Sequence, residues 1–296
     1  MRASVNGTSI YFDVDGPELE PSDGGLRRRP TIVALHGGPG FDQGYLRPGL
    51  GPLRGLAQVV YVDLRGQGRS AAAAIESCTL EQMADDVAAL CAATGIERPV
   101  VFGHSAGGFV AMQLALRHPE LVAGLILCST SPAMARIDDG RPPPPGVAER
   151  AGPEAAAVAA RLFGGDMSPE TGEAFGRLVL PFYAGPSHTD VPGSLMRLSG
   201  FSPEVARHFF GNLASGYDLR PRLGEIAAPA LVIISRHDWV TPPASGRAIA
   251  AGIPGARLVE LAESGHFGFS EEPERFLEAV SGFLADLPDV RRDPVA

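Results

Sequence analysis

The sequence predicts an α/β protein with a mostly parallel β-sheet flanked by helices and a helical segment inserted late in the chain. Two observations carry this prediction. Short apolar runs of β-forming residues alternate with helical patterns along most of the 296 residues. The alternation stops between residue 131 and about residue 216, where helical patterns continue without a strand among them. A chain of this length can bury one large core.

The predicted strands are runs of apolar and β-branched residues bounded by turn residues. A hairpin is expected over residues 4–14, because Asn6-Gly7 between β-like residues favours a two-residue turn. Arg27-Arg28-Arg29, which follows it, is expected in a solvated loop. The other strands are expected at residues 31–35, 58–63, 100–103, 121–128, 230–235 and 256–261.

Helical patterns accompany these strands at residues 79–94, 109–116 and 273–284. The first pattern has clear ends. Thr79 with Gln82 fits a capping box, and Gly95 fits a C-terminal stop. Strand–helix alternation of this kind predicts helices on both faces of a parallel sheet.

The inserted segment divides the chain into a core, residues 1–131 and 217–296, and a helical cap or lid, residues 132–216. Its helical patterns cover residues 155–163, 169–180 and 203–214, after an exposed, semi-rigid proline run. Open α/β sheets bind ligands at their strand ends, so an insertion there is expected to cover the site. The alternative is a separate small domain without functional contact.

Composition and charge narrow the function classes. A hydrophobic content of 45% argues against disorder, and a net charge of −9 disfavours nucleic acid or an anionic membrane surface as partner.

Residues 1–7 are too polar for a signal peptide, and no apolar stretch is long enough to span a bilayer. The three cysteines form no C-x-x-C pair. We therefore expect a cytoplasmic protein without metal or organic cofactor, acting on a small molecule or short peptide; nothing indicates an oligomeric state.

Ser105 is the candidate nucleophile. It lies in Gly103-His104-Ser105-Ala106-Gly107, a G-x-S-x-G pattern that follows an apolar strand and opens a helix. A serine at such a turn has a strained backbone, so small residues are needed around it. The turn would lift the hydroxyl clear of the sheet, and the new helix would point free N–H groups at the substrate.

A serine hydroxyl needs a base and an acid that orients the base. For this turn the chain order is serine, acid, histidine. Of the seven histidines, His266 fits best, because it follows the last strand in a loop with a neighbouring glycine. Asp238 follows the strand at residues 230–235 and is the favoured acid, whereas Asp218 is a weaker candidate.

A tetrahedral intermediate needs two N–H donors. One is expected from Ala106, the residue after the nucleophile. The other is expected from the glycine-rich run at residues 36–40, with Gly38 favoured and Gly37 as the alternative. Asp63 and Arg65, in a second glycine-rich turn, are interpreted as residues that pin the loop.

The motif set resembles the proline iminopeptidase group of α/β-hydrolases over nearly the whole chain. The resemblance rests on H-G-G-P-G at residues 36–40, D-x-R-G-x-G-x-S at 63–70, G-x-S-x-G-G at 103–108 and S-G-H-F at 264–267. It implies the α/β-hydrolase fold with an inserted cap. It also implies Ser105 as nucleophile, Asp238 as acid and His266 as base.

The lid departs from that group, whose tryptophan- and glutamate-containing motif holds the substrate's free amine. The single tryptophan, Trp239, is outside the lid, and the lid acids Glu149, Glu154, Glu170, Glu173 and Glu204 are ammonium-binding candidates that also fit solvated helix faces. Candidate substrate contacts are His36, Phe182, Tyr183, Glu204 and Phe267.

The sequence thus predicts a serine hydrolase that cleaves a small acyl substrate through an acyl-enzyme on Ser105. The substrate is an N-terminal prolyl amide or peptide, an ester or a lactone. Two alternatives remain: a carboxylesterase or lactonase without peptidase activity, and a ligand sensor or non-hydrolytic biosynthetic enzyme on the same fold.

Overall fold

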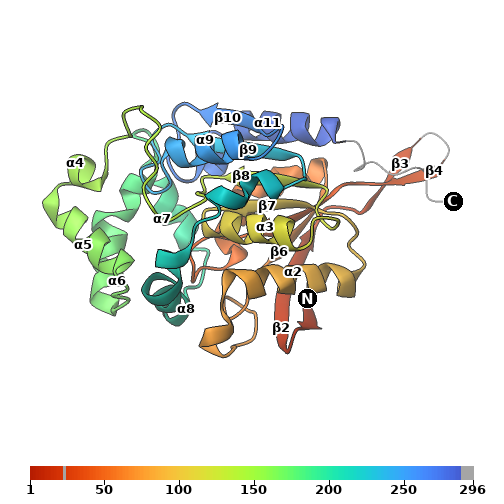
Figure 1. The fold of residues 1–296 in the computed structure, drawn as a ribbon, viewed down its shortest axis with the longest axis horizontal. Helices are drawn as coiled ribbons and strands as arrows, with labels where there is room; N and C mark the ends of the chain where they lie inside the picture. Colours follow the sequence, from red (N-terminus) through yellow and green to blue (C-terminus); the bar gives the residue numbers. More distant parts are fainter. Residues whose placement is uncertain (23–24, 288–296) are drawn as a thin grey trace.

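The computed structural model describes residues 1–22 and 25–287. An eight-stranded sheet in the order β1-β2-β6-β5-β7-β8-β9-β10 forms the centre of the molecule (Figure 1). The first two strands are antiparallel to their neighbours and the remaining pairs are parallel, as the sequence predicts. The strands are β1 (Arg2–Val5), β2 (Thr8–Asp15), β5 (Thr31–Leu35), β6 (Gln58–Val62), β7 (Val100–His104), β8 (Gly124–Cys128), β9 (Ala230–Ser235) and β10 (Arg257–Leu261).

The strand predictions are confirmed to within a few residues. β8 starts three residues after the expected start at residue 121, because Leu121 closes a turn by donating its N–H to His118 O. Asn6 and Gly7 both have positive φ, 44° and 72°, which is the geometry of a tight hairpin turn.

Helices cover both faces of the sheet, and an apolar cluster lies on each. One face carries α2 (Leu80–Thr94), α3 (Ala106–Arg117) and α9 (Pro243–Gly252); the other carries α1 (Arg47–Leu50), α10 (Gly268–Glu271) and α11 (Pro273–Asp286). Thr79 Oγ1 accepts the Gln82 N–H as expected, but the Gln82 side chain bonds to Asp86, so half of the predicted capping box forms.

The helices between β8 and β9 lie beyond one end of the sheet (Figure 1, left). They are α4 (Val147–Ala151), α5 (Pro153–Phe163), α6 (Pro169–Leu178), α7 (Val191–Met196) and α8 (Pro203–His208). The sequence missed α4 and α7, whose five and six residues are too few for a helical period to stand out. The boundaries of the cap at residues 132 and 216 stay a prediction. No helix among the described residues is long and apolar enough to cross a bilayer.

A second hairpin, β3 (Leu19–Ser22) and β4 (Gly25–Arg28), projects from the opposite end of the molecule (Figure 1). The prediction of a solvated loop for the arginine run is wrong. Arg27 and Arg28 belong to β4, and the run pairs with acids across the hairpin: Arg28 with Glu18, and Arg29 Nε with Glu20 at 2.6 Å. Opposite charges therefore face each other across the hairpin, and Glu20 lies directly opposite Arg27.

A buried ion pair fixes the loop after β6, where Arg65 is predicted to pin the chain. Arg65 Nε and Nη2 donate to the two carboxylate oxygens of Asp86 at 2.6 and 2.7 Å, and Asp86 is 1% exposed. Asp86→Asn is expected to lower the free energy of unfolding by roughly 3–5 kcal/mol, because it leaves a buried guanidinium without its counter-charge.

Urea denaturation measures this loss, and Asp85→Asn is the matched control. Asp85 of α2 pairs with Arg117 at the end of the neighbouring helix α3, but its side chain is 30% exposed. Removing an exposed pair costs below about 1 kcal/mol. Equal losses of unfolding free energy in Asp86→Asn and Asp85→Asn would show that burial does not make the Arg65–Asp86 pair more stabilising than an exposed one.

Candidate active site

Ser105 lies at the turn between β7 and α3, with φ +53° and ψ −124°. Few residues other than glycine adopt this backbone region. The chain is crowded on both sides: a Cβ on Gly103 would approach the Gly107 carbonyl oxygen to 2.6 Å, and one on Gly107 would overlap the Leu35 carbonyl oxygen. The G-x-S-x-G spacing is therefore a steric requirement of this turn.

Asp238 and His266 form a buried hydrogen-bonded pair at the ends of β9 and β10. Asp238 Oδ2 accepts from His266 Nδ1 at 2.9 Å and from Thr241 Oγ1 at 2.8 Å. Its Oδ1 accepts the N–H groups of Val240 and Thr241 at 2.9 and 3.0 Å. With Nδ1–H directed at the carboxylate, the neutral imidazole presents Nε2 as a proton acceptor.

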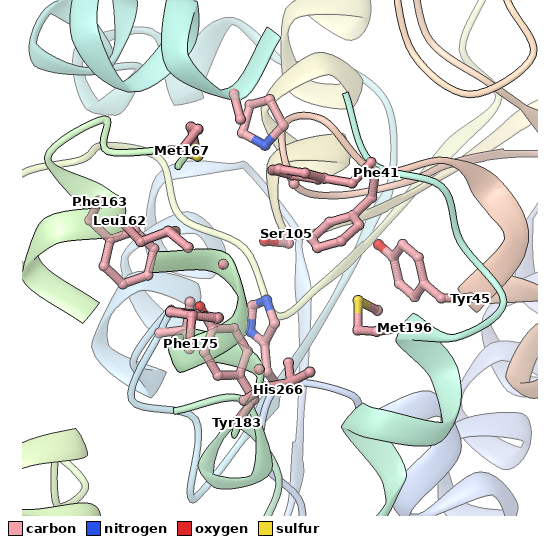
Figure 2. Close-up of a pocket in the computed structure, with 18 of the residues that line it drawn as sticks. Phe41, Tyr45, Ser105, Leu162, Phe163, Met167, Phe175, Tyr183, Met196 and His266 are labelled. Carbon is pink, nitrogen blue, oxygen red and sulfur yellow. The ribbon is translucent and has the colours of Figure 1, made fainter. Parts of the chain in front are cut away.

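Ser105 and His266 face one cavity of about 270 Å³, and Figure 2 shows the imidazole directed toward the serine. The described residues include no hydrogen bond from the Ser105 hydroxyl to His266, and such bonds are often long before substrate binds. The cap supplies most of the apolar wall, including Leu162, Phe163, Met167, Phe175, Met196 and Phe210.

Two backbone N–H groups beside Ser105 are free to bind an anion. Among the described residues, no hydrogen bond uses the N–H of Ala106 or of Gly38, which has φ +125°. Gly37, the sequence's alternative, is different: its N–H donates to Tyr45 Oη at 2.6 Å. The geometry therefore favours Gly38 over Gly37 as the second backbone N–H donor.

Two of the five predicted substrate contacts, Tyr183 and Phe267, line the cavity. The other three, His36, Phe182 and Glu204, do not line it. His36 is 1% exposed and its Nε2 accepts the Leu64 N–H at 3.1 Å. Phe182 packs under Arg150, 5.7 Å from ring to guanidinium, and Glu204 is exposed on α8. Asp218, the weaker acid candidate, pairs with exposed Arg220.

A buried network that the sequence did not reveal joins the two loops of the site. Tyr45 Oη accepts the Gly37 N–H and donates to His104 Nδ1 at 2.7 Å, and His104 Nε2 donates to the His266 carbonyl at 2.8 Å. Burial, followed by the nearby His266, holds the pKa of His104 well below its ordinary value. His104 is therefore a neutral structural link, and its position next to Ser105 was the only signal for it.

Tyr45→Phe is expected to lower the free energy of unfolding by about 1–3 kcal/mol, because it leaves the Gly37 N–H and His104 Nδ1 unpaired in the interior. Tyr45 is 1% exposed, so water cannot readily replace the hydroxyl. Urea denaturation measures the change. Tyr11→Phe, which removes a hydroxyl bonded to exposed Arg69 at 3.0 Å, should stay within about 0.5 kcal/mol. A loss of unfolding free energy in Tyr45→Phe that is no larger than the loss in Tyr11→Phe would contradict the prediction.

A larger groove of about 650 Å³ meets the apolar cavity at Ser105 and Gly38. Its walls are more polar, and many of them come from the segment between β8 and α4, from α4 itself, and from the segment between β9 and the start of α9. They include Ser131, Arg136, Glu149, Trp239 and Ser245. The serine thus lies at the junction of an apolar chamber and a mixed one.

Residues 30–273 match the family described as alpha/beta hydrolase fold. The chain belongs to this family. The alpha/beta hydrolase is 31% identical over 279 residues to a protein named carbamate hydrolase RutD from Caulobacter sp. strain K31, covering 92% of this chain and 97% of the relative. It is 30% identical over 260 residues to a pimeloyl-[acyl-carrier protein] methyl ester esterase from Aeromonas hydrophila, covering 86% and 95%.

A solved structure is similar as well. The enol-lactonase from Burkholderia xenovorans LB400 superposes with a TM-score of 0.74 at 28% identity, over 97% of this alpha/beta hydrolase and 100% of that chain. These relatives carry the names of hydrolases acting on carbamates, esters and lactones. The resemblance to the proline iminopeptidase group is not represented among them.

Proposed function

We propose that this alpha/beta hydrolase is a serine hydrolase that cleaves small esters, lactones or carbamates through an acyl-enzyme on Ser105. The observation that carries the proposal is the buried Asp238–His266 pair, whose imidazole lines the same cavity as Ser105. A hydroxyl, a base and an orienting acid in this relation are the parts of a nucleophilic triad.

In the proposed mechanism, Ser105 Oγ attacks the acyl carbon while His266 Nε2 takes its proton. Asp238 stabilises the imidazolium, and the N–H groups of Ala106 and Gly38 bind the negative oxygen of the tetrahedral intermediate. Breakdown breaks the bond to the leaving group, which receives the proton from Nε2. Water then attacks the acyl-enzyme with His266 as base, releasing the acid and restoring Ser105.

The cavity lining supports esters, lactones and carbamates over N-terminal prolyl peptides. A free amine needs a carboxylate nearby, and no carboxylate lies among the described residues that line the apolar chamber. Among the described residues that line the adjoining groove, Glu149 is the one acid that could bind an ammonium group. The apolar wall suits a hydrocarbon group.

A substrate panel tests the proposal: a short-chain p-nitrophenyl ester, a simple lactone, an aryl carbamate and a prolyl arylamide. We expect Ser105-dependent hydrolysis of at least one of the first three. Cleavage of the arylamide, lost in Glu149→Gln, would instead establish an amine site and an aminopeptidase. No turnover of any compound, without labelling of Ser105 by a fluorophosphonate, would favour a sensor or a non-hydrolytic enzyme.

A further inference from the structure

Glu271 is a buried acid that the proposed mechanism does not use. It ends α10 and is 5% exposed. Its Oε1 accepts the Phe267 N–H at 2.9 Å, and its Oε2 accepts the N–H groups of Gly265 and Gly185 at 2.8 and 2.7 Å. Two of these donors are the residues on either side of His266, and the third belongs to the cap.

The cap segment at residues 182–185 is tied to the same loop by a further bond, in which the His266 N–H donates to Tyr183 O at 2.6 Å. Within the cap, Arg150 of α4 orders this segment by donating to the carbonyl oxygens of Phe182 and Ala184 at 2.6 and 2.8 Å. The backbones also touch closely, since a Cβ on Gly265 would overlap Tyr183 O. The loop that carries His266 is thus held from three directions: by Asp238, by the cap backbone and by Glu271.

We propose that Glu271 is a positioning residue: by binding the N–H groups on both sides of His266 and that of Gly185, it fixes the imidazole against Asp238 and locks the cap segment 182–185 to the histidine loop. This inference rests on the proposed roles of Asp238 and His266.

The chemistry of the group favours this role. Burial raises the pKa of Glu271, and the three N–H donors oppose that effect by stabilising the carboxylate. A buried carboxylate with three backbone partners has one well-defined orientation, which suits a side chain that holds a loop in place. Positioning groups that sit behind catalytic side chains control alignment to within about 0.5 Å in productive sites.

The test variant is Glu271→Gln, which keeps the size but replaces one acceptor oxygen with an NH₂ group that must face an N–H donor. With a compound of the panel that the wild-type protein hydrolyses, kcat is expected to fall roughly 10²-fold with KM nearly unchanged, because the histidine is misplaced while the pocket is unaltered. The downfield proton resonance of His266 Nδ1–H, bound to Asp238, should broaden or disappear.

Glu274→Gln is the control, since Glu274 lies exposed at the start of α11; it should keep the wild-type kcat and resonance. A folded Glu271→Gln protein with wild-type kcat and an unchanged resonance would overturn the proposal. If this variant does not fold, amide hydrogen exchange on the wild-type protein decides. Gly185, Gly265 and Phe267 are expected to exchange slowly and at similar rates, and fast exchange of Gly265 and Phe267 would overturn the proposal.

Fluorophosphonate labelling separates the positioning role of Glu271 from the serine hydrolase activity itself. A wild-type protein that a fluorophosphonate does not label at Ser105 contradicts the serine hydrolase itself. Labelling of wild type and Glu271→Gln at equal rates contradicts only the positioning role.

Discussion

Ser105→Ala is expected to lower kcat/KM for the active substrate by roughly 10⁴- to 10⁶-fold, leaving only the rate that binding and the N–H donors provide. The hydroxyl oxygen is the atom that attacks, and the hydroxyl of the nearby Thr130 is already engaged, because it donates its Oγ1–H to Ser105 O at 2.7 Å. Stability should change little, because the side chain is small and half-buried.

Steady-state kinetics measure the loss of kcat/KM, and mass spectrometry after fluorophosphonate treatment locates the modified residue. The adduct should map to the peptide with Ser105 and be absent from the variant. Ser77→Ala is a suitable control, because Ser77 lies in the short 3-10 helix Ile75–Ser77, lines neither chamber and donates its Oγ–H to Ala74 O at 2.6 Å. Turnover by Ser105→Ala near the wild-type rate would rule out the acyl-enzyme.

Asp238→Asn is expected to lower kcat by about 10⁴-fold through the tautomer of His266. Two backbone N–H groups bind the Oδ1 position, so the amide oxygen of asparagine must stay there. The NH₂ group then takes the Oδ2 position and donates to His266 Nδ1. The imidazole proton moves to Nε2, which can no longer accept the proton of Ser105.

Asp218→Asn provides the comparison. Asp218 is bound to Arg220 at 2.5 Å on the surface, away from both chambers. Loss of an exposed pair should change kcat less than about 2-fold. Similar kcat values for the variants at positions 238 and 218 would show that Asp238 is not the orienting acid.

The sequence predicts those parts of the molecule whose signals are local. Strands β5 and β9 coincide with their apolar runs, and the glycines around Ser105 are explained by backbone contacts within a few residues or across one strand pair. The hairpin of β3 and β4 was missed because Pro21 and an arginine run do not form a β pattern, and its stability comes from pairing with acids across the turn.

Contacts between distant segments left no such signal. Tyr45 meets His104 across 59 positions, and Glu271 meets Gly185 across 86, so no periodicity or motif connects them. The sequence likewise gives no signal for which residues of the cap line the cavity. Glu204 and Phe175 are both on cap helices, but only packing decides that Phe175 lines the cavity while Glu204 faces outward.

The attachment of residues 182–185 has a consequence for engineering the protein. Helices α5 and α6 share a small apolar cluster with Val147, Val179 and Trp239, and they supply Leu162, Phe163 and Phe175 to the cavity. A chimaera that exchanges the whole insertion would also remove the Tyr183 carbonyl that accepts the His266 N–H, and Arg150, which holds the neighbouring carbonyls of Phe182 and Ala184. Grafts joined near Gly152 and Val179 are expected to change substrate preference while the recipient keeps its own reaction machinery.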